Sequence, residues 1–355
     1  MLFRSLRNEQ IRQAIDAEQV FNGYRSARSE LDARFPGSMS WKTIAGGTYL
    51  YRKVHGVSRS LGPKSPETEK TYESFRNGRA RERDLVRGLA TRLDEMAPVN
   101  RALGIGRVPL IGARVLRQLD GSGLLGRAIH VVGTNALYAY ERMAGVRIDS
   151  GLVATGDVDL LLDARRSLKI AAPAVSSEGL LGLLRKADTS FSLMGRRSFR
   201  AVNRDGFMVD RIKPVSGNRF AEAGHSRLGG DDDLHAVEIE GLAWLVNSPK
   251  QRVVVIDDRG YPLDMAVPDP RAFALHKAWL AARADRAPAK RQRDAAQAKL
   301  VAGMVAERLP NLRFDADDLS ALPAALRRAA ANLNSGPESR SEQPDRDDGG
   351  LEPGW

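Results

Sequence analysis

The spacing of apolar residues in the first third of the chain predicts two helices separated by a hairpin. Residues 1–35 carry apolar side chains at near-helical intervals from Ile11 to Tyr24, which favours one helix. Two β-prone runs then flank Gly46 and Gly47 in SMSWKTIAGGTYLYRKV, a pattern typical of a β-hairpin. We interpret the following stretch, SRSLGPKSPETEK, as a Gly-Pro loop that leads into the next helix.

Ser65 and Pro66, followed by Glu67 and Glu69, mark the start of that helix. Proline suits the first helical turn, and acidic residues interact favourably with the positive end of the helix dipole. We expect the helix to continue through RNGRARERDLVRGLATRLDEMAPVNRAL with a break at Gly78. Its high charge indicates that much of it faces solvent, and PLIGARVLRQLDG predicts one more helix before a glycine-rich turn.

The centre of the chain changes to short apolar strands interleaved with helices. The predicted strands are AIHVVG, VDLLLD, GFMVDRIKPV, AVEIEGLAWLV and the hairpin RVVVIDDRGYPLDMAV, which turns at Asp258–Gly260. The predicted helices are TNALYAYERMAG, which ends at Gly145, and SSEGLLGLLRKA, with a serine cap at Ser176 or Ser177. This mixture of elements favours an α+β fold.

The C-terminal part is predicted to be helical. DPRAFALHKAWLAARA has Asp269 as N-cap and Pro270 at the first helical position, and KRQRDAAQAKLVAGMVAERL and DADDLSALPAALRRAAANL follow. From Asn334 onward Ser, Gly, Pro, Asp and Glu predominate, which predicts disorder. The predicted regions are a helical and hairpin part at 1–124, a central core at 125–268, C-terminal helices at 269–333 and an acidic tail at 334–355.

Composition excludes several classes of protein. The chain has 355 residues and no cysteine, which excludes disulfides, thiolate zinc sites and cysteine nucleophiles. We find no apolar run of about 18 residues and no signal-peptide core at the start, so we expect a cytoplasmic protein that does not enter a membrane. The net charge is +11, and the acidic tail leaves the remainder more basic still. Such a charge favours polyanionic partners such as nucleotides or RNA, although basic proteins without these partners are also common.

The stretch VATGDVDLLLD raises the question of why a buried strand carries two acids. Side chains alternate along a strand, so Asp157 and Asp159 share one face, about 6–7 Å apart along the chain. Two carboxylates so placed can converge on one hard cation such as Mg²⁺. The alternative is an amphipathic strand with one solvated face. Asp163 falls on the same face as Asp157 and Asp159, but Leu161 separates it from them on that face. We interpret Asp163 as closing the strand outside any site.

A third acid, Asp210, lies on an apolar face of its predicted strand between Met208 and Ile212. A carboxylate in such a place needs a compensating interaction. A third carboxylate from an adjacent strand would allow a second metal ion to bind. Asp257, Asp258 and Asp264 are rival candidates, although Asp258 precedes Arg259-Gly260 and is typical of a turn.

Gly133 and Thr134 stand where a strand runs into a helix. Glycine allows the backbone to approach a ligand closely, threonine offers a hydroxyl, and the helix from Asn135 directs backbone N–H groups at an anion. The pattern indicates a triphosphate cradle. It is not a P-loop, because no Gly-Lys-Ser/Thr follows.

Together, VVGTNALYAYE, ATGDVDLLLD and FALHKAWLA resemble the nucleotidyltransferase superfamily of DNA polymerase β. They are similar to a bacterial branch that includes abortive-infection type toxins, and YLYRKVHGVSRSLGPKSPETE resembles uncharacterised proteins of the same branch. The resemblance implies a polymerase β-like mixed-sheet core over roughly residues 125–300. It also implies transfer of a nucleoside monophosphate from an NTP to a hydroxyl acceptor with one or two Mg²⁺ ions.

The resemblance also implies a role for each matching residue. The implied metal ligands are Asp157, Asp159 and Asp210. The implied phosphate-binding residues are Gly133, Thr134, Thr155 and Lys277. Asp210 is implied as base or third ligand, and Thr155 as the polar residue of a Thr-x-Asp-x-Asp motif. The implied acceptor is RNA, such as a tRNA end, or a protein side chain, and a toxin role stays open. The alternative is an inactive nucleotide- or RNA-binding protein of the same fold, against which the intact carboxylates argue.

Several other residues allow two interpretations. Lys277 shares an apolar stripe with Phe273 and Leu280, so it is also compatible with a surface lysine, and His276 is better interpreted as structural. The aromatic and basic residues of the first hairpin could stack on a base or an RNA end, or they could pack within the hairpin. These residues are Trp41, Tyr49, Tyr51 and Arg52. A basic helical run is typical of a solvated face and compatible with a phosphate contact: Lys290, Arg291 and Arg293.

Overall fold

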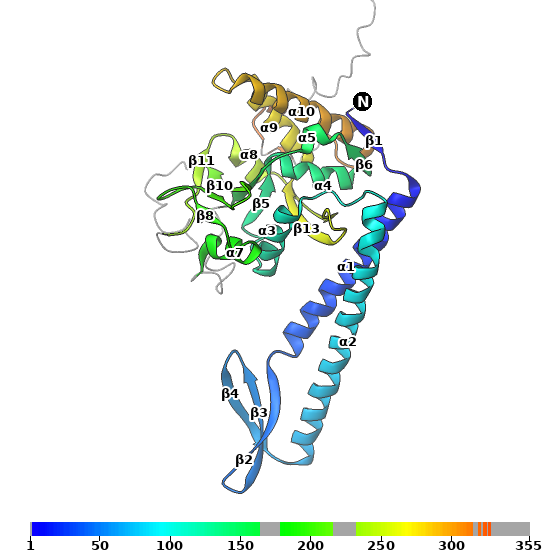
Figure 1. Ribbon diagram of the computed structural model, residues 1–355, viewed down its shortest axis with the longest axis vertical. Helices are drawn as coiled ribbons and strands as arrows, with labels where there is room; N and C mark the ends of the chain where they lie inside the picture. Colours follow the sequence, from blue (N-terminus) through cyan, green and yellow to red (C-terminus); the bar gives the residue numbers. More distant parts are fainter. Residues whose placement is uncertain are drawn as a thin grey trace, which may run out of the picture.

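A long two-helix arm projects from a body of strands and helices (Figure 1). The computed structural model describes residues 2–163, 178–215, 232–314, 319–320, 322–324 and 326–327. The arm consists of α1 (Asn8–Arg34) and α2 (Pro66–Ala102), which pack against each other and carry a small sheet at the end remote from the body. Of the helices in the described part of the chain, none combines the length and apolar character needed to cross a lipid bilayer.

The sheet at the tip of the arm has three antiparallel strands in sequence order. These are β2 (Ser38–Ile44), β3 (Gly47–Val54) and β4 (Val57–Pro63). The predicted hairpin is confirmed, but the predicted Gly-Pro loop is wrong, because residues 57–63 pair with β3. Gly62 and Pro63 stand at the end of β4 beside a β-bulge, where neither residue prevents pairing of the strand before them.

The helix α2 begins as predicted and has no break at Gly78. Ser65 accepts a hydrogen bond from the Thr68 backbone N–H (3.3 Å), and Pro66 occupies the first turn. Gly78 is buried, and a Cβ there would lie 2.5 Å from the Phe35 ring. The glycine therefore allows close packing and does not interrupt the helix.

The first residues of the chain correct a third prediction, that of one helix over 1–35. Residues Phe3–Ser5 form β1, which pairs antiparallel with β6 (Val146–Ile148), so the helix α1 begins only at Asn8. This pairing attaches the start of the arm to the body.

The body is built on a mixed sheet with the strand order β5-β7-β10-β9-β8, and β11 also pairs with β10. The strand bounds are β5 Ile129–Val132, β7 Asp157–Leu162, β8 Ser192–Leu193, β9 Arg200–Val202, β10 Met208–Pro214 and β11 Val237–Ile239. β10 runs parallel to β7 and β11, whereas the other pairs are antiparallel. The expected combination of helices with a mixed sheet is confirmed.

The predicted strand AVEIEGLAWLV is wrong in its second half. Only Val237–Ile239 form β11, and Gly241, with φ of +82°, leads into the helix α8 (Leu242–Asn247). Leu242, Leu245 and Val246 are buried from this helix, at the i, i+3, i+4 spacing of a helical face.

The remaining elements surround the sheet. The helices are α3 Leu110–Gly121, η1 Gly133–Asn135, α4 Ala136–Met143, α5 Ser150–Val153, α7 Gly179–Ala187, α9 Pro270–Ala282 and α10 Pro288–Arg308. The predicted hairpin consists of β12 (Lys250–Ile256) and β13 (Pro262–Pro268). Ser176, Ser177, most of the predicted helix from Asp315 and the tail 334–355 lie outside the described residues.

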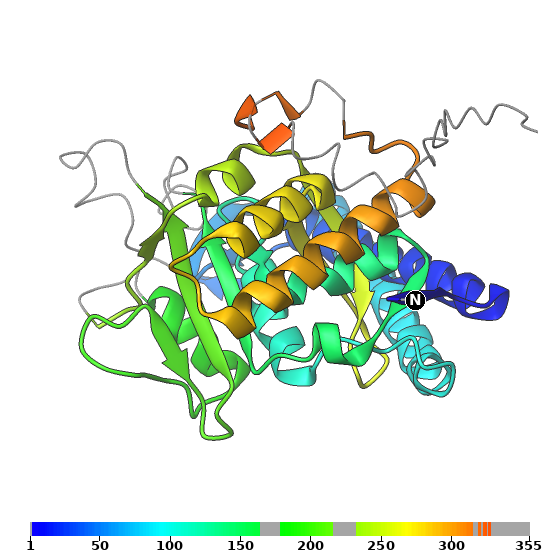
Figure 2. The same cartoon turned by 90° about the horizontal axis from the view of Figure 1, so that it is seen from above.

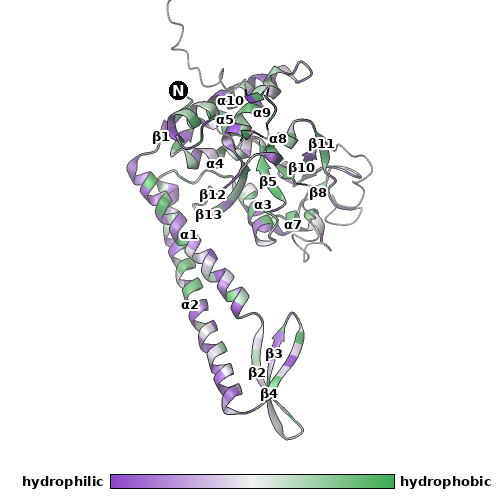
Figure 3. Ribbon diagram, turned by 180° about the vertical axis from the view of Figure 1, so that it is seen from behind, coloured by the Kyte–Doolittle hydropathy of each residue, from purple (hydrophilic) through white to green (hydrophobic). Residues whose placement is uncertain are grey.

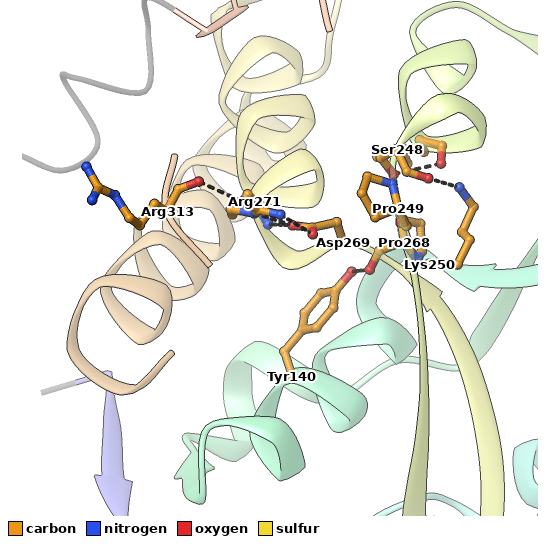
Figure 4. A network of polar contacts seen from close by, with 9 residues as sticks. Tyr140, Ser248, Pro249, Lys250, Pro268, Asp269, Arg271 and Arg313 are labelled. Atoms are coloured by element: carbon orange, nitrogen blue, oxygen red, sulfur yellow. Dashed lines mark hydrogen bonds and ion pairs between the residues drawn. The ribbon is translucent and has the colours of Figure 1, made fainter. Parts of the chain in front are cut away.

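The helices α9 and α10 lie side by side across the body (Figure 2). A buried polar network anchors the start of α9 (Figure 4). The carboxylate of Asp269 caps the helix by accepting from the Arg271 N–H (2.8 Å), as predicted, and also pairs with the Arg271 guanidinium (2.7 Å). The Tyr140 hydroxyl donates to the Pro268 carbonyl (3.0 Å). This network positions Lys277, almost two turns further along α9.

Candidate active site

Two neighbouring strands bring the three predicted acids together. Asp157 and Asp159 lie on β7, and the parallel pairing of β7 with β10 places Asp210 directly beside Asp159. Paired residues in a sheet project from the same face. The two strands are about fifty residues apart in sequence, so the sheet topology assembles the cluster.

The closeness of the three acids changes the pKa of Asp159. Its pKa is raised from 3.8 to about 7, first by burial and then by the charges of Asp157 and Asp210. Lys277 and Arg200 act in the opposite direction. Asp157 accepts a hydrogen bond from the Thr155 hydroxyl, so Thr155 lies at the site where it was predicted. The cluster therefore holds more negative charge than its cations balance, a common feature of functional sites.

The turn η1 lies against the acids. Gly133 has a φ of +64°, and a Cβ there would lie 2.1 Å from Oδ2 of Asp159. The Asn135 amide donates to the Asp157 backbone carbonyl (2.5 Å), and the Thr134 hydroxyl accepts from the amide of Gln297 (3.2 Å). The predicted glycine-threonine turn therefore lies beside the predicted metal ligands, with α10 packed over it.

Lys277 is buried, so the alternative of a surface lysine is wrong: the residue is only 8% exposed. Its Nζ donates to Oδ1 of Asp294 (2.7 Å), and Arg286 donates to the other oxygen of that carboxylate (2.5 Å). Burial lowers the pKa of the Lys277 ammonium, while the charges of Asp294 and Asp159 oppose that change. Lys277 thus contributes positive charge to the acidic cluster, but its direct partner is Asp294.

Arg200, which the sequence analysis did not identify, is the direct partner of Asp210. It stands opposite Asp210 in the antiparallel pairing of β9 with β10. Its Nε and Nη2 donate to the two carboxylate oxygens at 2.6 and 2.5 Å, a bidentate geometry. The hydrogen bonds to Asp210 raise the pKa of the guanidinium, and the charges of Asp157 and Asp159 add to this effect. The side chain is 30% exposed, so it also borders solvent.

The donor atoms at Asp157 and Asp159 suit a hard divalent cation such as Mg²⁺, which prefers oxygen ligands and few protein carboxylates. Burial first, and then the charges of Asp157 and Asp210, raise the pKa of Asp159, and a bound cation would oppose both effects by stabilising the ionised carboxylate. Within the described ranges, no three acidic or histidine side chains are arranged to hold a single metal ion. Because the Asp210 carboxylate is paired with Arg200, the arrangement fits one ion on two carboxylates better than two ions on three.

The rival acids belong to other parts of the body. Asp257 accepts from the backbone N–H groups of Arg259 and Tyr261 in the β12–β13 turn. Asp258, in the same turn, accepts from the Leu110 N–H (3.2 Å). Asp264 on β13 pairs with Arg252 (3.0 Å). Asp163 directly follows β7, and its N–H donates to the Ala128 carbonyl (2.8 Å).

Two further predictions concern α9 and α10. His276 packs against Trp244 and Trp279, with ring centroids 6.1 and 5.9 Å away, and burial lowers its pKa to about 3. In the basic run, Lys290 and Arg291 are exposed, whereas Arg293 donates to the Ala154 carbonyl (2.6 Å). Ala154 precedes Thr155, so Arg293 reaches the rim of the site.

Comparison with known proteins adds one match. A family model described as Nucleotidyltransferase matches residues 111–323, which is more than half of the chain. No curated protein and no solved structure matches the chain. The matched region begins in α3 and includes the acids, the glycine-threonine turn, Arg200 and Lys277, whereas both helices of the arm lie outside it.

Proposed function

This chain belongs to a nucleotidyltransferase family, and we propose that its Asp157–Asp159 site transfers a nucleoside monophosphate from an NTP to a hydroxyl group. One observation carries the proposal. The two acids lie beside Gly133 and Thr134, and the pKa of Asp159 is raised to about 7 by burial and neighbouring carboxylates. A cation that carries a triphosphate would relieve this repulsion.

In this proposal Asp157 and Asp159 hold one Mg²⁺ ion. When bound, the ion would screen the charge of the triphosphate and of the departing pyrophosphate. Thr155, whose hydroxyl donates to Asp157, keeps that carboxylate oriented. Gln297 orients the Thr134 hydroxyl from α10, and Asn135 ties the turn to β7.

The triphosphate would be bound by Thr134 and by the positive charges of Lys277 and Arg200. Arg200 is 30% exposed and already oriented into the cluster, and a guanidinium binds phosphate oxygens in the same bidentate way as a carboxylate. Transfer of Arg200 to the triphosphate would free Asp210 to accept the proton of the attacking hydroxyl. The new bond then joins the acceptor oxygen to the α-phosphorus, and the bond from that phosphorus to pyrophosphate breaks.

The polymerase β-like identity of the sheet, the acceptor and the biological role are also part of the proposal. The resemblance described above suggests RNA, such as a tRNA end, or a protein side chain, and a toxin or defence role. A second candidate has its own support. Because Arg200 pairs with Asp210, the chain is also compatible with a protein that binds nucleotides or RNA without turnover.

The test is incubation with each α-labelled NTP, Mg²⁺ and total RNA or cell lysate. We expect label to move to RNA or protein with the wild type and not with Asp157→Ala or Asp159→Ala. Asp205→Asn is the matched control, because Asp205 is an exposed acid in the β9–β10 turn, and it should transfer normally. Tight NTP binding without transfer to any acceptor would refute the enzyme and support the second candidate.

A further inference from the structure

The small sheet at the tip of the arm has two chemically different faces. Cross-strand pairing places Lys42 beside Tyr49, Ser40 beside Tyr51 and Ser38 beside Lys53, so these side chains share one face. The strand β4 adds Ser60 beside Tyr51 and Ser58 beside Lys53. We call this surface the open face: Ser38, Ser40, Lys42, Tyr49, Tyr51, Lys53, Ser58 and Ser60.

The opposite face packs on the arm. Trp41 contacts Tyr72 of α2 with ring centroids 5.7 Å apart, and the Arg52 guanidinium lies over the Phe75 ring (5.3 Å). Leu50 is fully buried on the same side. The four aromatic and basic residues that the sequence offered as one stacking group are therefore divided. Trp41 and Arg52 are used in packing, and Tyr49 and Tyr51 are left on the open face.

The side chains of the open face are accessible. Lys42, Lys53 and the four serines are exposed, and the two tyrosines are half-buried. Lys42 lies over the Tyr51 ring (4.7 Å) and donates to Ser58 (3.5 Å), so a cation and an aromatic ring are held together at the centre of the sheet. Among the described residues, neither Lys42 nor Lys53 forms an ion pair with an acid.

The charge of this segment is of one sign. Residues 35–64 contain five basic residues and no Asp or Glu: Lys42, Arg52, Lys53, Arg59 and Lys64. The segment lies at the end of the arm remote from the body, as Figures 1 and 3 both show, so acids of the body do not neutralise it. Of its five cations, Lys64 pairs with Glu69 of α2 (3.2 Å) and lies outside the open face. A surface with aromatic rings, hydroxyl donors and the two cations Lys42 and Lys53 complements a polyanion with planar groups.

We propose that the open face binds single-stranded RNA. Unpaired bases would stack on Tyr49 and Tyr51, and Lys42 and Lys53 would contact the phosphates. A duplex hides its bases, and the acidic side chains of a peptide have no rings to stack, so the partly accessible tyrosines beside two lysines favour a single strand. This inference about the open face rests on the proposed function, because RNA is one of the acceptors proposed for the nucleotidyl transfer. The arm would hold the RNA away from its reacting end and raise the local concentration of that end at Asp157 and Asp159.

The experiment measures fluorescence anisotropy of a labelled 20-nucleotide single-stranded RNA with the full chain, without NTP or Mg²⁺. We expect Y49A/Y51A to weaken binding at least about tenfold, because stacking contributes ~1–3 kcal/mol per base. Y49F/Y51F keeps both rings and should bind within about twofold of the wild type, which is a smaller change than the loss of one stacked base would cause. K42A/K53A should weaken binding and reduce the salt dependence by the equivalent of about two phosphate contacts.

K70A/R76A removes the same charge from exposed positions of α2 and serves as the matched control. It should bind RNA like the wild type. D157A should also bind like the wild type, so a failure of the proposed chemistry leaves this test intact. The proposal is refuted if Y49A/Y51A binds as the wild type does, if the control weakens binding equally, or if a duplex of the same length competes as well as the single strand.

Discussion

Replacing Asp159 with asparagine should stabilise the protein above neutral pH in the absence of Mg²⁺. In the folded state the pKa of Asp159 is about 7, compared with an ordinary value of 3.8. Between these values the folded protein keeps a proton that the unfolded chain has lost. The contribution of Asp159 to the free energy of unfolding is therefore greatest below pH 4, falls as the pH rises, and levels off above about 7.

The change in pKa corresponds to an upper limit of about 4 kcal/mol in the free energy of unfolding. Asp159 is largely buried but keeps some solvent exposure, so solvent screens part of the repulsion, and we expect about 2 kcal/mol. Asparagine has the same shape without the charge. At pH 8 Asp159→Asn should therefore unfold at a higher urea concentration than the wild type, by about 2 kcal/mol, and at pH 4 the two should nearly coincide.

The assay is urea unfolding followed by tryptophan fluorescence at pH 4, 6 and 8, with and without Mg²⁺. Asp205→Asn, which removes an exposed acid from the neighbouring turn, should leave the stability within about 0.5 kcal/mol of the wild type. Mg²⁺ should stabilise the wild type more than Asp159→Asn. If the variant is no more stable than the wild type at pH 8, or if its advantage persists unchanged at pH 4, the inferred repulsion is wrong.

Three further predictions test the site and its support. Arg200→Met releases Asp210, so it should raise the number of Mn²⁺ ions bound per chain from one to two. EPR titration without NTP measures this number, and two ions bound to the wild type would contradict the one-ion site. Gly133→Ala should abolish label transfer and lower the thermal midpoint, because a Cβ would lie 2.1 Å from Oδ2 of Asp159; transfer at the wild-type rate would show that this close approach is not required. Arg271→Met should cost about 3–5 kcal/mol in urea unfolding, because it leaves the buried Asp269 carboxylate without its cation; a loss below about 1 kcal/mol, the scale of a surface pair, would count against this explanation.

The extent to which the sequence predicts the site depends on how local each contact is. The strand period alone places Asp157 and Asp159 on one face, and the helix-start signals at Asp269 and Pro270 are local as well. The position of Asp210 beside Asp159 requires the pairing of β7 with β10, which no nearby residue determines. The burial of Lys277 could not be predicted from its own helix either, because its partner Asp294 comes from α10.

The fold was mispredicted where packing overrides local preference. Gly78 has a low intrinsic helix propensity, but the Phe35 ring fills the space that a side chain would need, so the helix continues. Gly62 and Pro63 indicate a loop, yet the residues before them pair with β3. In both places the deciding contact comes from a segment that the local pattern does not include.

Arg200 could have been found from the sequence by hairpin geometry. The segment VNRDGFMVD has an Asn-Arg-Asp-Gly turn between two short β-prone runs. The loop is the three residues Arg204–Gly206, closed by a hydrogen bond from the Asn203 N–H to the Phe207 carbonyl (3.1 Å). This register pairs Val202 with Met208 and, two residues further from the loop, Arg200 with Asp210. A candidate third acid on a strand next to a turn should therefore be examined together with its cross-strand neighbour.

The pairing of Arg200 with Asp210 also changes how the charge of the site is understood. Three carboxylates face two cations, Arg200 and Lys277, which leaves one unbalanced negative charge at the cluster. A single divalent ion would reverse that sign and make the cluster attractive to a triphosphate, whereas a second ion would have to compete with the guanidinium for Asp210. Metal and nucleotide should therefore bind in a coupled way, with NTP affinity strongly dependent on Mg²⁺ in the wild type. Asp159→Asn removes part of the unfavourable charge, so it should bind NTP in the absence of Mg²⁺ better than the wild type does.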